Sequence, residues 1–336
     1  MTYIEEAIIK LSNKEDLTFD MAKGTMDEIM NGQASDVQIG SYLTALSIKG
    51  ETIDEISGSA VSMRNNATRL DHSTATLEIV GTGGDGSNSF NISTTSAIVI
   101  SAAGVAVTKH GNRSASSKCG AADVLEALGV NINMDVEDSM KVLEEIDLTF
   151  LFAQKYHTAM KYVAPVRSEL GIKTIFNILG PLANPAFADY ELMGVYSEEL
   201  VEPLANVLNN MRIKAMVVYG QDGLDEISVS APTTVCEVKN GEVIKYEIKP
   251  EDFGMTPSSK EDLLGGDSPC NAKITLNILK GEKGPKRDAV LLNSGAALYL
   301  RGKVESISEG IQLAGDVIDS GKALKQLEDF IRLSNN

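Results

Sequence analysis

The first 67 residues show a helical pattern of apolar positions. After Asp36, apolar residues recur at the spacing of one helix face, at Val37, Ile39, Tyr42, Leu43 and Leu46. Asp36 can cap this helix at its start, and Gly50 can end it. No stretch in this part has the alternation of a strand. We therefore expect residues 3–67 to be helical throughout.

From about residue 76 the pattern changes to short β-branched runs separated by segments of helix length. The expected strands are Leu77–Val80, Val105–Thr108, Thr149–Phe152 and Ala215–Tyr219. This alternation predicts a largely parallel sheet with helices on its faces. Further on, two alternating runs in residues 233–248 flank Asn240-Gly241, which predicts a hairpin. Residues 285–333 have the pattern of amphipathic helices.

Residues 157–185 are mostly helical in pattern and close with the breakers Gly180-Pro181 and Asn184-Pro185. We expect them to pack back on the N-terminal helices. The predicted fold class is α/β, with a small all-helical N-terminal domain and a larger α/β domain whose mostly parallel central sheet is flanked by helices. Because no long linker is present, the two domains are expected to be interwoven. The helical domain would take residues 1–72 with about 165–188, and the α/β domain 73–164 with 189–336.

Composition and net charge restrict the kinds of molecule that this protein is expected to bind. The 336 residues hold 30 Lys and Arg against 47 Asp and Glu, a net charge of -17, and such a field repels nucleic acids and anionic membranes. Three scattered cysteines argue against a disulfide framework or a four-ligand zinc site. The N-terminus has acids where a signal peptide has bases, and the longest apolar stretch, 97–107, is interrupted and too short to span a bilayer. We expect a cytoplasmic protein that binds neither nucleic acid nor membrane.

A glycine-rich loop follows the first expected strand. Its sequence, GTGGDGSNSFNIST at 81–94, contains a G-x-G-x-x-G match at Gly81, Gly83 and Gly86. A dinucleotide-binding loop also needs an acid about 20 residues further on, and no Asp or Glu occurs between Gly86 and Ala122. No GK[ST] and no G-x-S-x-G occurs in the chain, so neither a Walker-type loop nor a hydrolase elbow is present.

The acid-free stretch itself predicts a second anion-binding loop. It contains KHGNRSASSKCG, in which Lys109, His110, Arg113 and Lys118 accompany serines and glycines. Two such loops, each after a strand and before a helix, would direct backbone N–H groups and positive helix ends at one small, highly charged ligand. The alternative is that both are ordinary turns. Asn91, Ser93 and Thr94 open the helix after the first loop, either as caps or as a phosphate site.

A third polar loop follows the strand at 215–219. Its sequence GQDGLDEIS places Asp222, Asp225 and Glu226 together. Magnesium brought by a polyphosphate takes one or two carboxylates along with phosphate oxygens and waters, which Asp225 and Glu226 could supply. The alternative is a solvated turn.

Five segments together resemble the anthranilate phosphoribosyltransferase family: GTGGD at 81–85, NIST at 91–94, KHGNR with SSKCG from 109 to 120, VRSELGIKTIFNILGPLANP at 166–185, and DGLDE at 222–226. The resemblance implies transfer of the 5-phosphoribosyl group of phosphoribosyl pyrophosphate (PRPP) to anthranilate in tryptophan biosynthesis. It also implies a fold similar to the class II nucleoside phosphorylases, a homodimer formed through the helical part, and two Mg²⁺ per monomer.

The same resemblance implies roles for the matching residues. Those expected to bind PRPP are Gly81, Thr82, Gly83, Gly84, Asp85, Asn91, Ser93, Thr94, Lys109, Ser116, Ser117 and Gly120. Those expected to bind anthranilate are Gly81, His110, Asn112 and Arg167. Ser93, Asp225 and Glu226 would bind Mg²⁺, and Lys109 and His110 would be catalytic. Cys119 stands where many relatives have serine, so a phosphate contact there would fall to its backbone N–H.

The implied reaction needs neutralisation of the leaving group more than it needs a protein nucleophile. Breaking the bond between C1 and the diphosphate leaves positive charge on the ribose and negative charge on the leaving group. Backbone N–H groups, Lys109 and Mg²⁺ can stabilise that charge. Arg167 offers a fork for a carboxylate, and the alternative is a helix-surface ion pair with Glu169 or a neighbour. The rival functions are a nucleoside phosphorylase on the similar fold and a nucleic-acid-binding sister branch, which the negative charge disfavours.

Overall fold

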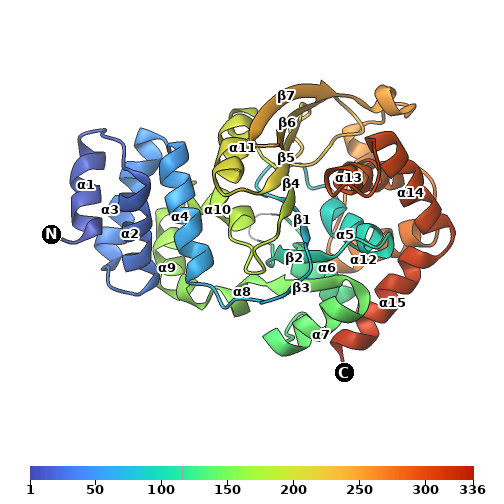
Figure 1. Ribbon diagram of the computed structural model, residues 1–336, viewed down its shortest axis with the longest axis horizontal. Coiled ribbons are helices and arrows are strands. Elements are labelled where there is room, and N and C mark those ends of the chain that lie inside the picture. The colour runs from blue at the N-terminus through green and yellow to red at the C-terminus, as the bar shows by residue number, and fades with distance from the viewer. Residues whose placement is uncertain (115–116) are drawn as a thin grey trace.

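Four helices fill the N-terminal part of the computed structural model, which describes residues 1–114 and 117–336. They are α1 Tyr3–Ser12, α2 Phe19–Met30, α3 Asp36–Lys49 and α4 Ile53–Asn65 (Figure 1). The prediction of helices here is confirmed. Hydroxyl side chains at the N-caps begin these helices, and three of them, Thr2, Ser35 and Thr52, form reciprocal capping boxes.

The predicted start of α3 was wrong by one residue. Ser35, not Asp36, is the cap, because its hydroxyl accepts from the Gln38 N–H while the Gln38 side chain accepts from the Ser35 N–H. Asp36 is the first helical residue, where a negative charge is favourable near the helix N-terminus. Gly50 ends the helix as expected, with φ of 88°.

A seven-stranded sheet forms the centre of the larger domain, in the order β3-β2-β1-β4-β5-β6-β7. Its strands are β1 Leu77–Gly81, β2 Val107–Gly111, β3 Leu148–Phe152, β4 Tyr190–Gly194, β5 Lys214–Gly220, β6 Thr233–Lys239 and β7 Glu242–Ile248. The first five strands are parallel, and β6 and β7 are antiparallel. The hairpin is confirmed, because Asn240 and Gly241 both have positive φ, 54° and 83°.

Two strands differ from expectation, and buried polar side chains explain both differences. Strand β4 was not predicted, because the buried Glu191 interrupts its apolar pattern. Strand β2 begins two residues later than expected and runs on through Lys109 and His110, which are buried although polar.

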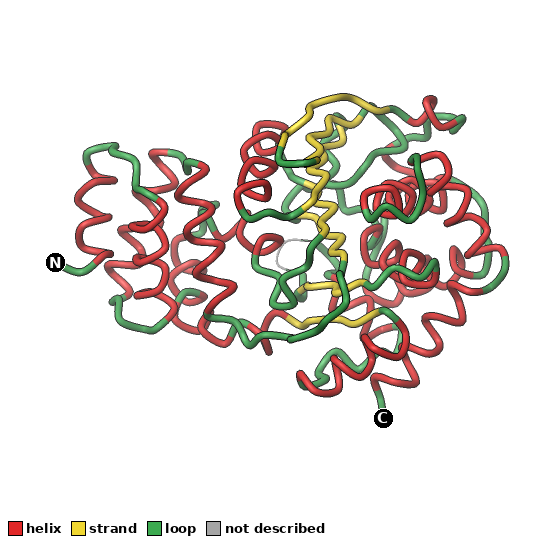
Figure 2. The backbone as a smooth tube through the Cα atoms, viewed as in Figure 1, coloured by secondary structure: helices red, strands yellow, loops and turns green. Residues whose placement is uncertain are grey.

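Helices cover both faces of the sheet (Figure 2). Alternate strand residues face two different cores. Leu192 and Met216 pack with α5 (Ile92–Ala102) and α13 (Pro285–Leu300), whereas Met193 and Val217 pack with α11 (Val201–Asn210) and helices of the N-terminal part. The helices of the first core and its surroundings are α5 Ile92–Ala102, α6 Ala121–Ala127, α7 Val136–Ile146, α12 Ser268–Leu279, α13 Pro285–Leu300, α14 Ile307–Asp319 and α15 Lys322–Ser334. On the other side lie η2 Glu198–Leu200 and α11 Val201–Asn210, and the short helices η3 Pro250–Phe253 and η4 Lys260–Leu263 follow the hairpin.

The chain returns to the N-terminal helices after β3. This segment contains α8 Ala153–Tyr156, η1 Thr158–Tyr162, α9 Ala164–Leu170 and α10 Phe176–Leu182. Val166 and Leu179 are buried in the same core as Leu43 of α3 and Ile56 of α4, so this segment packs on the N-terminal helices. Within the described ranges, no helix combines the length and apolar character needed to cross a bilayer.

Candidate active site

The first glycine-rich loop joins β1 to α5 and is open on one side. Its glycines Gly83, Gly84 and Gly86 have φ of 70°, 75° and 71°, a region that favours glycine, and a Cβ at any of them would meet nothing within 4 Å. Gly81 is covered instead, because a Cβ there would lie 2.3 Å from Oδ2 of Asp225. The loop is therefore open to solvent at Gly83, Gly84 and Gly86, while Asp225 covers it at Gly81.

Thr82 anchors this loop to the end of β4, the neighbouring strand in the sheet. Its N–H donates to the carbonyl of Gly194 at 2.9 Å, and its hydroxyl accepts from the Tyr196 N–H at 3.1 Å. The N–H and the hydroxyl of Thr82 are thus both bonded within the protein.

The second loop, between β2 and α6, is closed by a carboxylate in the first turn of α6. Oδ2 of Asp123 accepts from the N–H groups of Ser114 and Gly120, both at 2.9 Å. Arg113 pairs with Asp123 and with Glu126, each at 2.9 Å. Arg113, one of the cations expected to bind an anion in this loop, therefore forms ion pairs with acids just beyond the acid-free stretch.

The two loops meet at Asn91. Because β1 and β2 are parallel neighbours, both loops leave the same edge of the sheet. Nδ2 of Asn91 donates to the carbonyl of Cys119 at 3.1 Å, which joins the start of α5 to the second loop. Asn91 stands at the N-cap position of α5 as expected, but its side chain makes no capping hydrogen bond. Ser117 is exposed in the second loop, and Ser116 lies outside the described residues.

Asp225 and Glu226 reach from the loop after β5 to the first loop and to α5. Oδ2 of Asp225 accepts from the Gly83 N–H at 2.7 Å, and Oε1 of Glu226 accepts from the Ser93 N–H at 3.0 Å. Both side chains are buried, so the alternative of a solvated turn is wrong for them. Asp85 completes an acidic group, since its Oδ2 accepts from the Asp225 N–H at 3.4 Å.

Burial and mutual repulsion make these acids hard to ionise. Burial, together with the charges of Asp85 and Glu226, holds the pKa of Asp225 well above its usual range. Burial raises the pKa of Glu226 to about 7, against the attraction of Lys109. Among the described residues, no three His, Cys, Asp or Glu side chains converge closely enough to hold a metal alone. A cation here would need ligand oxygens in addition to these carboxylates, as Mg²⁺ ordinarily takes.

Lys109 lies buried between two acids. The residue is 3% exposed, and its ammonium donates to the carbonyl of Ile79 at 2.7 Å and lies 4.0 Å from Oε1 of Glu78. Burial lowers the pKa of Lys109, while Glu78 and Glu226 oppose this change. The lysine is therefore the positive charge that the described structure places between β1 and the acidic group.

His110 points to the other face of β2, beside a second histidine. The ring centroids of His110 and His157 are 5.0 Å apart, and Nε2 of His110 is buried without a hydrogen-bond partner in the described structure. Burial holds the pKa of His110 well below its usual range, so the ring is neutral. Asn112 is exposed at the end of the strand, where its side chain accepts from Gln154 at 3.4 Å.

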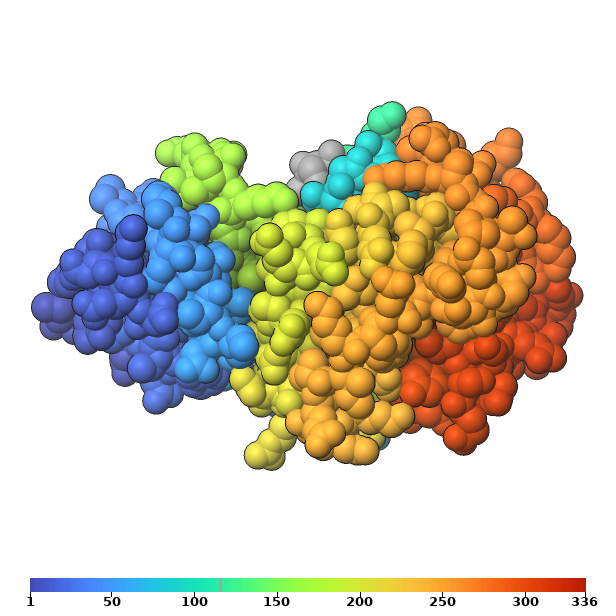
Figure 3. Space-filling model, turned by 90° about the horizontal axis from the view of Figure 1, so that it is seen from above, coloured from blue at the N-terminus to red at the C-terminus, as the bar shows by residue number. Residues whose placement is uncertain are grey.

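Arg167 lies on α9 and is half-buried. Its guanidinium is 5.3 Å from the ring centroid of Phe176, and no ion pair with Glu169 forms in the part of the chain described. No hydrogen bond or ion pair of the described structure joins Arg167 to His110. In the space-filling view a notch separates the green segment around α9 from the cyan segment around the first loop (Figure 3).

Beneath the loops, a layer of buried charge links the sheet to α4, and sequence reasoning missed it. Glu78 and Glu191 stand side by side in register on β1 and β4. Oε2 of Glu78 accepts from the His110 N–H at 2.7 Å, while neither oxygen of Glu191 has a partner in the described structure. Burial raises the pKa of Glu78 to about 7 and that of Glu191 to about 8. Lys109 is the cation that faces Glu78, and Arg64 is the cation that faces Glu191. Nε of Arg64 donates to the carbonyl of Leu182 at 2.8 Å. The available signal was a glutamate inside an otherwise apolar strand sequence.

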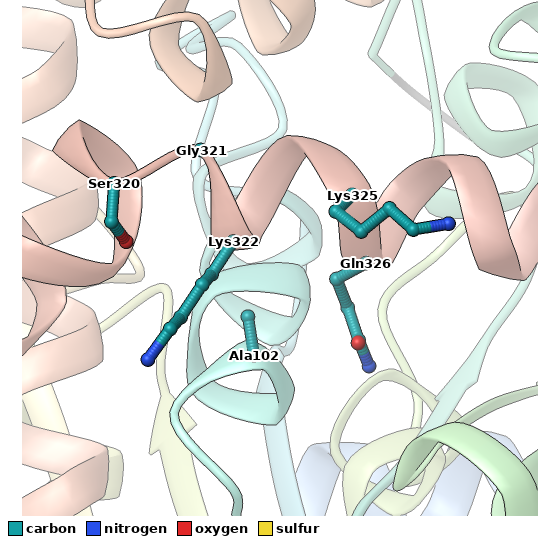
Figure 4. A pocket seen from close by; sticks show the side chains of 6 residues that line it. All are labelled: Ala102, Ser320, Gly321, Lys322, Lys325 and Gln326. Atoms are coloured by element: carbon teal, nitrogen blue, oxygen red, sulfur yellow. The ribbon is translucent and has the colours of Figure 1, made fainter.

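An open hollow of about 430 Å³ at the start of α15 is not the same site. It is lined by Ala102, Ser320, Gly321, Lys322, Lys325 and Gln326 (Figure 4). Ala102 is the last residue of α5, roughly 15 Å along the helix from the first loop. Lys325 already pairs with Asp329 at 2.7 Å.

Comparisons with known proteins agree with this architecture. Residues 5–67 match the helical bundle domain of the glycosyl transferase family, and residues 73–324 match its a/b domain. The chain is 64% identical to the anthranilate phosphoribosyltransferase of Methanobrevibacter smithii over 99% of this chain and 100% of the relative. It is 60% identical to that of Lachnoclostridium phytofermentans, with 99% of each chain covered.

Solved structures give the same result. The anthranilate phosphoribosyltransferase of Thermus thermophilus superposes with a TM-score of 0.94 at 43% identity, with 100% of both chains covered. The Saccharomyces cerevisiae enzyme in complex with PRPP and Mg superposes with a TM-score of 0.92 at 29% identity, covering 99% of this chain and 98% of the other. The predicted fold class is confirmed. The chain belongs to the anthranilate phosphoribosyltransferases, within the glycosyl transferase family.

Proposed function

We propose that this chain transfers the 5-phosphoribosyl group of PRPP to the amine of anthranilate, giving N-(5-phosphoribosyl)anthranilate and pyrophosphate in tryptophan biosynthesis. One observation carries the proposal: the two glycine- and serine-rich loops meet at Asn91, and Asp225 and Glu226 contact the first loop and α5. Backbone donors for a diphosphate and carboxylates for its counter-ion therefore adjoin each other.

For PRPP, the backbone of Gly81, Thr82, Gly83 and Gly84 with Asp85 would line the diphosphate. Ser93 and Thr94, at the N-terminus of α5, would bind the 5′-phosphate, where the helix dipole favours an anion. Asn91 keeps one Nδ2 hydrogen for a phosphate oxygen, since its Oδ1 and its other Nδ2 hydrogen are bonded within the protein. Ser117 and Gly120, with Ser116, would complete the cradle from the second loop.

Binding of PRPP requires an exchange of partners in this arrangement. The N–H groups of Gly83 and Ser93 are bonded to Asp225 and Glu226. A phosphate can take those donors once the carboxylates turn to another positive charge. Binding of the phosphates and of a cation would thus support each other.

The acidic group fits Mg²⁺ by its chemistry. Its donors are all carboxylate oxygens. Burial and then the charges of Asp85 and Glu226 raise the pKa of Asp225 well above its usual range, and a cation would relieve that repulsion. Asp225 faces the first loop and Glu226 faces Ser93, which supports two separate ions held by Asp225, Glu226 and Ser93. Bound there, Mg²⁺ would neutralise negative charge on the departing diphosphate.

The protein's own part in the reaction is positioning and charge stabilisation. Lys109 supplies a preorganised positive charge, already desolvated, near the leaving group. The amine of anthranilate then attacks C1 from the opposite side and inverts it. Because an aromatic amine is weakly basic, no strong base is needed, and the neutral His110 can accept a hydrogen bond at Nε2.

Anthranilate would bind between the second loop and α9. The guanidinium of Arg167, which has no carboxylate partner in the described structure, suits the carboxylate of an aromatic acid in two hydrogen bonds. Gly81, His110 and Asn112 would line the rest of this site.

The helical part would form one domain from residues 1–72 with about 165–188, and 73–164 with 189–336 would form the other. Shared burial of Val166 and Leu179 with residues of α3 and α4 supports this division. A homodimer through the helical domain is supported by large apolar side chains left exposed on α1 and α3, namely Tyr3, Ile9, Val37 and Ile48. A cytoplasmic location is supported by three cysteines that form no disulfide.

A steady-state assay tests the function. With PRPP and Mg²⁺ present, anthranilate fluorescence should fall while pyrophosphate appears in equal amount. Phosphate-dependent cleavage of a nucleoside, with no loss of anthranilate, would instead support a nucleoside phosphorylase and contradict the proposal.

A further inference from the structure

Residues 263–275, here named the bracing segment, pack against the turn that joins the first loop to α5. The Phe90 N–H donates to the carbonyl of Leu263 at 3.0 Å, and the Gly265 N–H donates to the carbonyl of Asn88 at 2.9 Å. Only glycine fits at 265, because a Cβ there would lie 2.8 Å from Cα of Phe90. The segment is therefore in backbone contact with the loop immediately before Asn91.

A chain of hydrogen bonds runs from the bracing segment to the second loop. The Gly266 N–H donates to Oδ1 of Asn271 at 2.7 Å, and Nδ2 of Asn271 donates to Oδ1 of Asn91 at 2.9 Å. Nδ2 of Asn91 then donates to the carbonyl of Cys119 at 3.1 Å. The first group can only donate and the last can only accept, so the orientation of both side-chain amides is fixed by the chain itself.

A second pair of side chains repeats this contact one helical turn further on. The hydroxyls of Thr275 and Thr95 lie 2.9 Å apart, and the Thr95 hydroxyl donates to the carbonyl of Asn91 at 2.9 Å. Since Thr95 has one hydroxyl proton, Thr275 must be the donor of the pair. Asn271 and Thr275 on α12 thus face Asn91 and Thr95 on α5.

We propose that Asn271 is a positioning residue for PRPP binding. It touches no substrate; it holds the Asn91 side chain in the orientation that ties the second loop to the first. It is 2% exposed, and an apolar side chain could fill its place without burying polar atoms. The series of hydrogen bonds through Asn271 instead sets the spacing of the two phosphate-binding loops. This role rests on the proposed function of those loops.

The test compares Asn271→Asp with the matched control Thr275→Val. The aspartate has nearly the same shape and still accepts from the Gly266 N–H, but it cannot donate to Asn91. We expect the KM for PRPP to rise roughly five- to thirtyfold, the usual effect of losing one or two buried hydrogen bonds. The KM for anthranilate should stay near the wild-type value. Hydrogen exchange of the amides in residues 117–125 should speed up, because the second loop loses its hydrogen bond from Asn91 to Cys119.

Thr275→Val removes a hydrogen bond from the same helix but leaves the link from Asn91 to Cys119 in place. It should lower the melting temperature without raising the KM for PRPP or the exchange of residues 117–125. If the aspartate variant folds poorly, Asn271→Leu, whose side chain fills the same volume, takes its place. The leucine variant should show the same rise in the KM for PRPP and the same faster exchange of residues 117–125.

Two results would overturn the inference: equal changes in both readouts for the Asn271 and Thr275 variants, or wild-type behaviour of the Asn271 variants. Absence of transferase activity in the wild type would refute the proposed function instead. The exchange measurement does not depend on turnover, so it still tests the link between the loops in that case.

Discussion

The buried glutamates Glu78 and Glu191 beneath the two loops predict the direction in which stability changes with pH. Glu191 lies beside Glu78 in the sheet, both of its oxygens lack hydrogen-bond partners in the described structure, and Arg64 is the cation that faces it. Glu191→Gln replaces an acid that is costly to ionise with a neutral side chain of the same shape. The variant should gain stability relative to the wild type as the pH rises.

The magnitude follows from the pKa of Glu191, which burial raises from 4.5 to about 8. Ionising the buried side chain therefore costs about 5 kcal/mol more than ionising it in the unfolded chain. Below pH 4.5 the acid is protonated in both states, so its contribution to stability is fully present. Between pH 4.5 and about 8 only the unfolded chain ionises, and the free energy of unfolding falls by about 1.4 kcal/mol per pH unit. Glutamine has no such loss.

Denaturant unfolding of both proteins across this range is the assay. The free energy of unfolding of the variant minus that of the wild type should rise by about 3 kcal/mol between about pH 5 and pH 7. Glu242→Gln, an exposed change on β7 of the same sheet, is the matched control and should leave the difference constant. A constant difference for Glu191→Gln as well would refute the argument from burial.

Three further predictions concern the proposed site. Lys109→Met should cost about 3 kcal/mol in kcat, the usual loss for one preorganised group, and a fall of only a few fold would show that the lysine does not serve the leaving group. Replacing Asp225 and Glu226 with Asn and Gln should abolish Mg²⁺-dependent turnover while circular dichroism still reports a cooperative melt; unchanged dependence on metal would reject these residues as ligands. Arg167→Ala should raise the KM for anthranilate roughly tenfold or more, because a bidentate charged contact is lost. A selective rise in the KM for PRPP would mean that Arg167 serves the other substrate.

Most of the fold could be predicted because periodicity reports which positions are buried. The N-terminal helices, the parallel strands other than β4, and the hairpin have apolar residues at the spacing of their element. The exceptions have polar residues on their inner face. Glu191 hid strand β4, and α12 was not predicted because Asn271 and Thr275 face α5 through hydrogen bonds.

The site was harder to predict, because its energetics depend on residues far apart in the chain. The motifs placed the loops and the acids, and the contact of Asn91 with Cys119 joins those loops. The partners of Lys109 could not be found in this way, since Glu78 lies 31 residues before it in a strand with no motif. The motif also gave no sign that Asp123 would close the second loop.

The central claim is that amides of the first loop bind the diphosphate while Asp225 and Glu226 hold its metal. A crystal structure with PRPP and Mg²⁺ tests this claim most directly. We expect diphosphate oxygens on the Gly83 N–H and 5′-phosphate oxygens on the Ser93 N–H, with both carboxylates turned onto the metal. A diphosphate bound elsewhere, for example beside Lys322 at the start of α15, with the carboxylates still bonded to those amides, would contradict it.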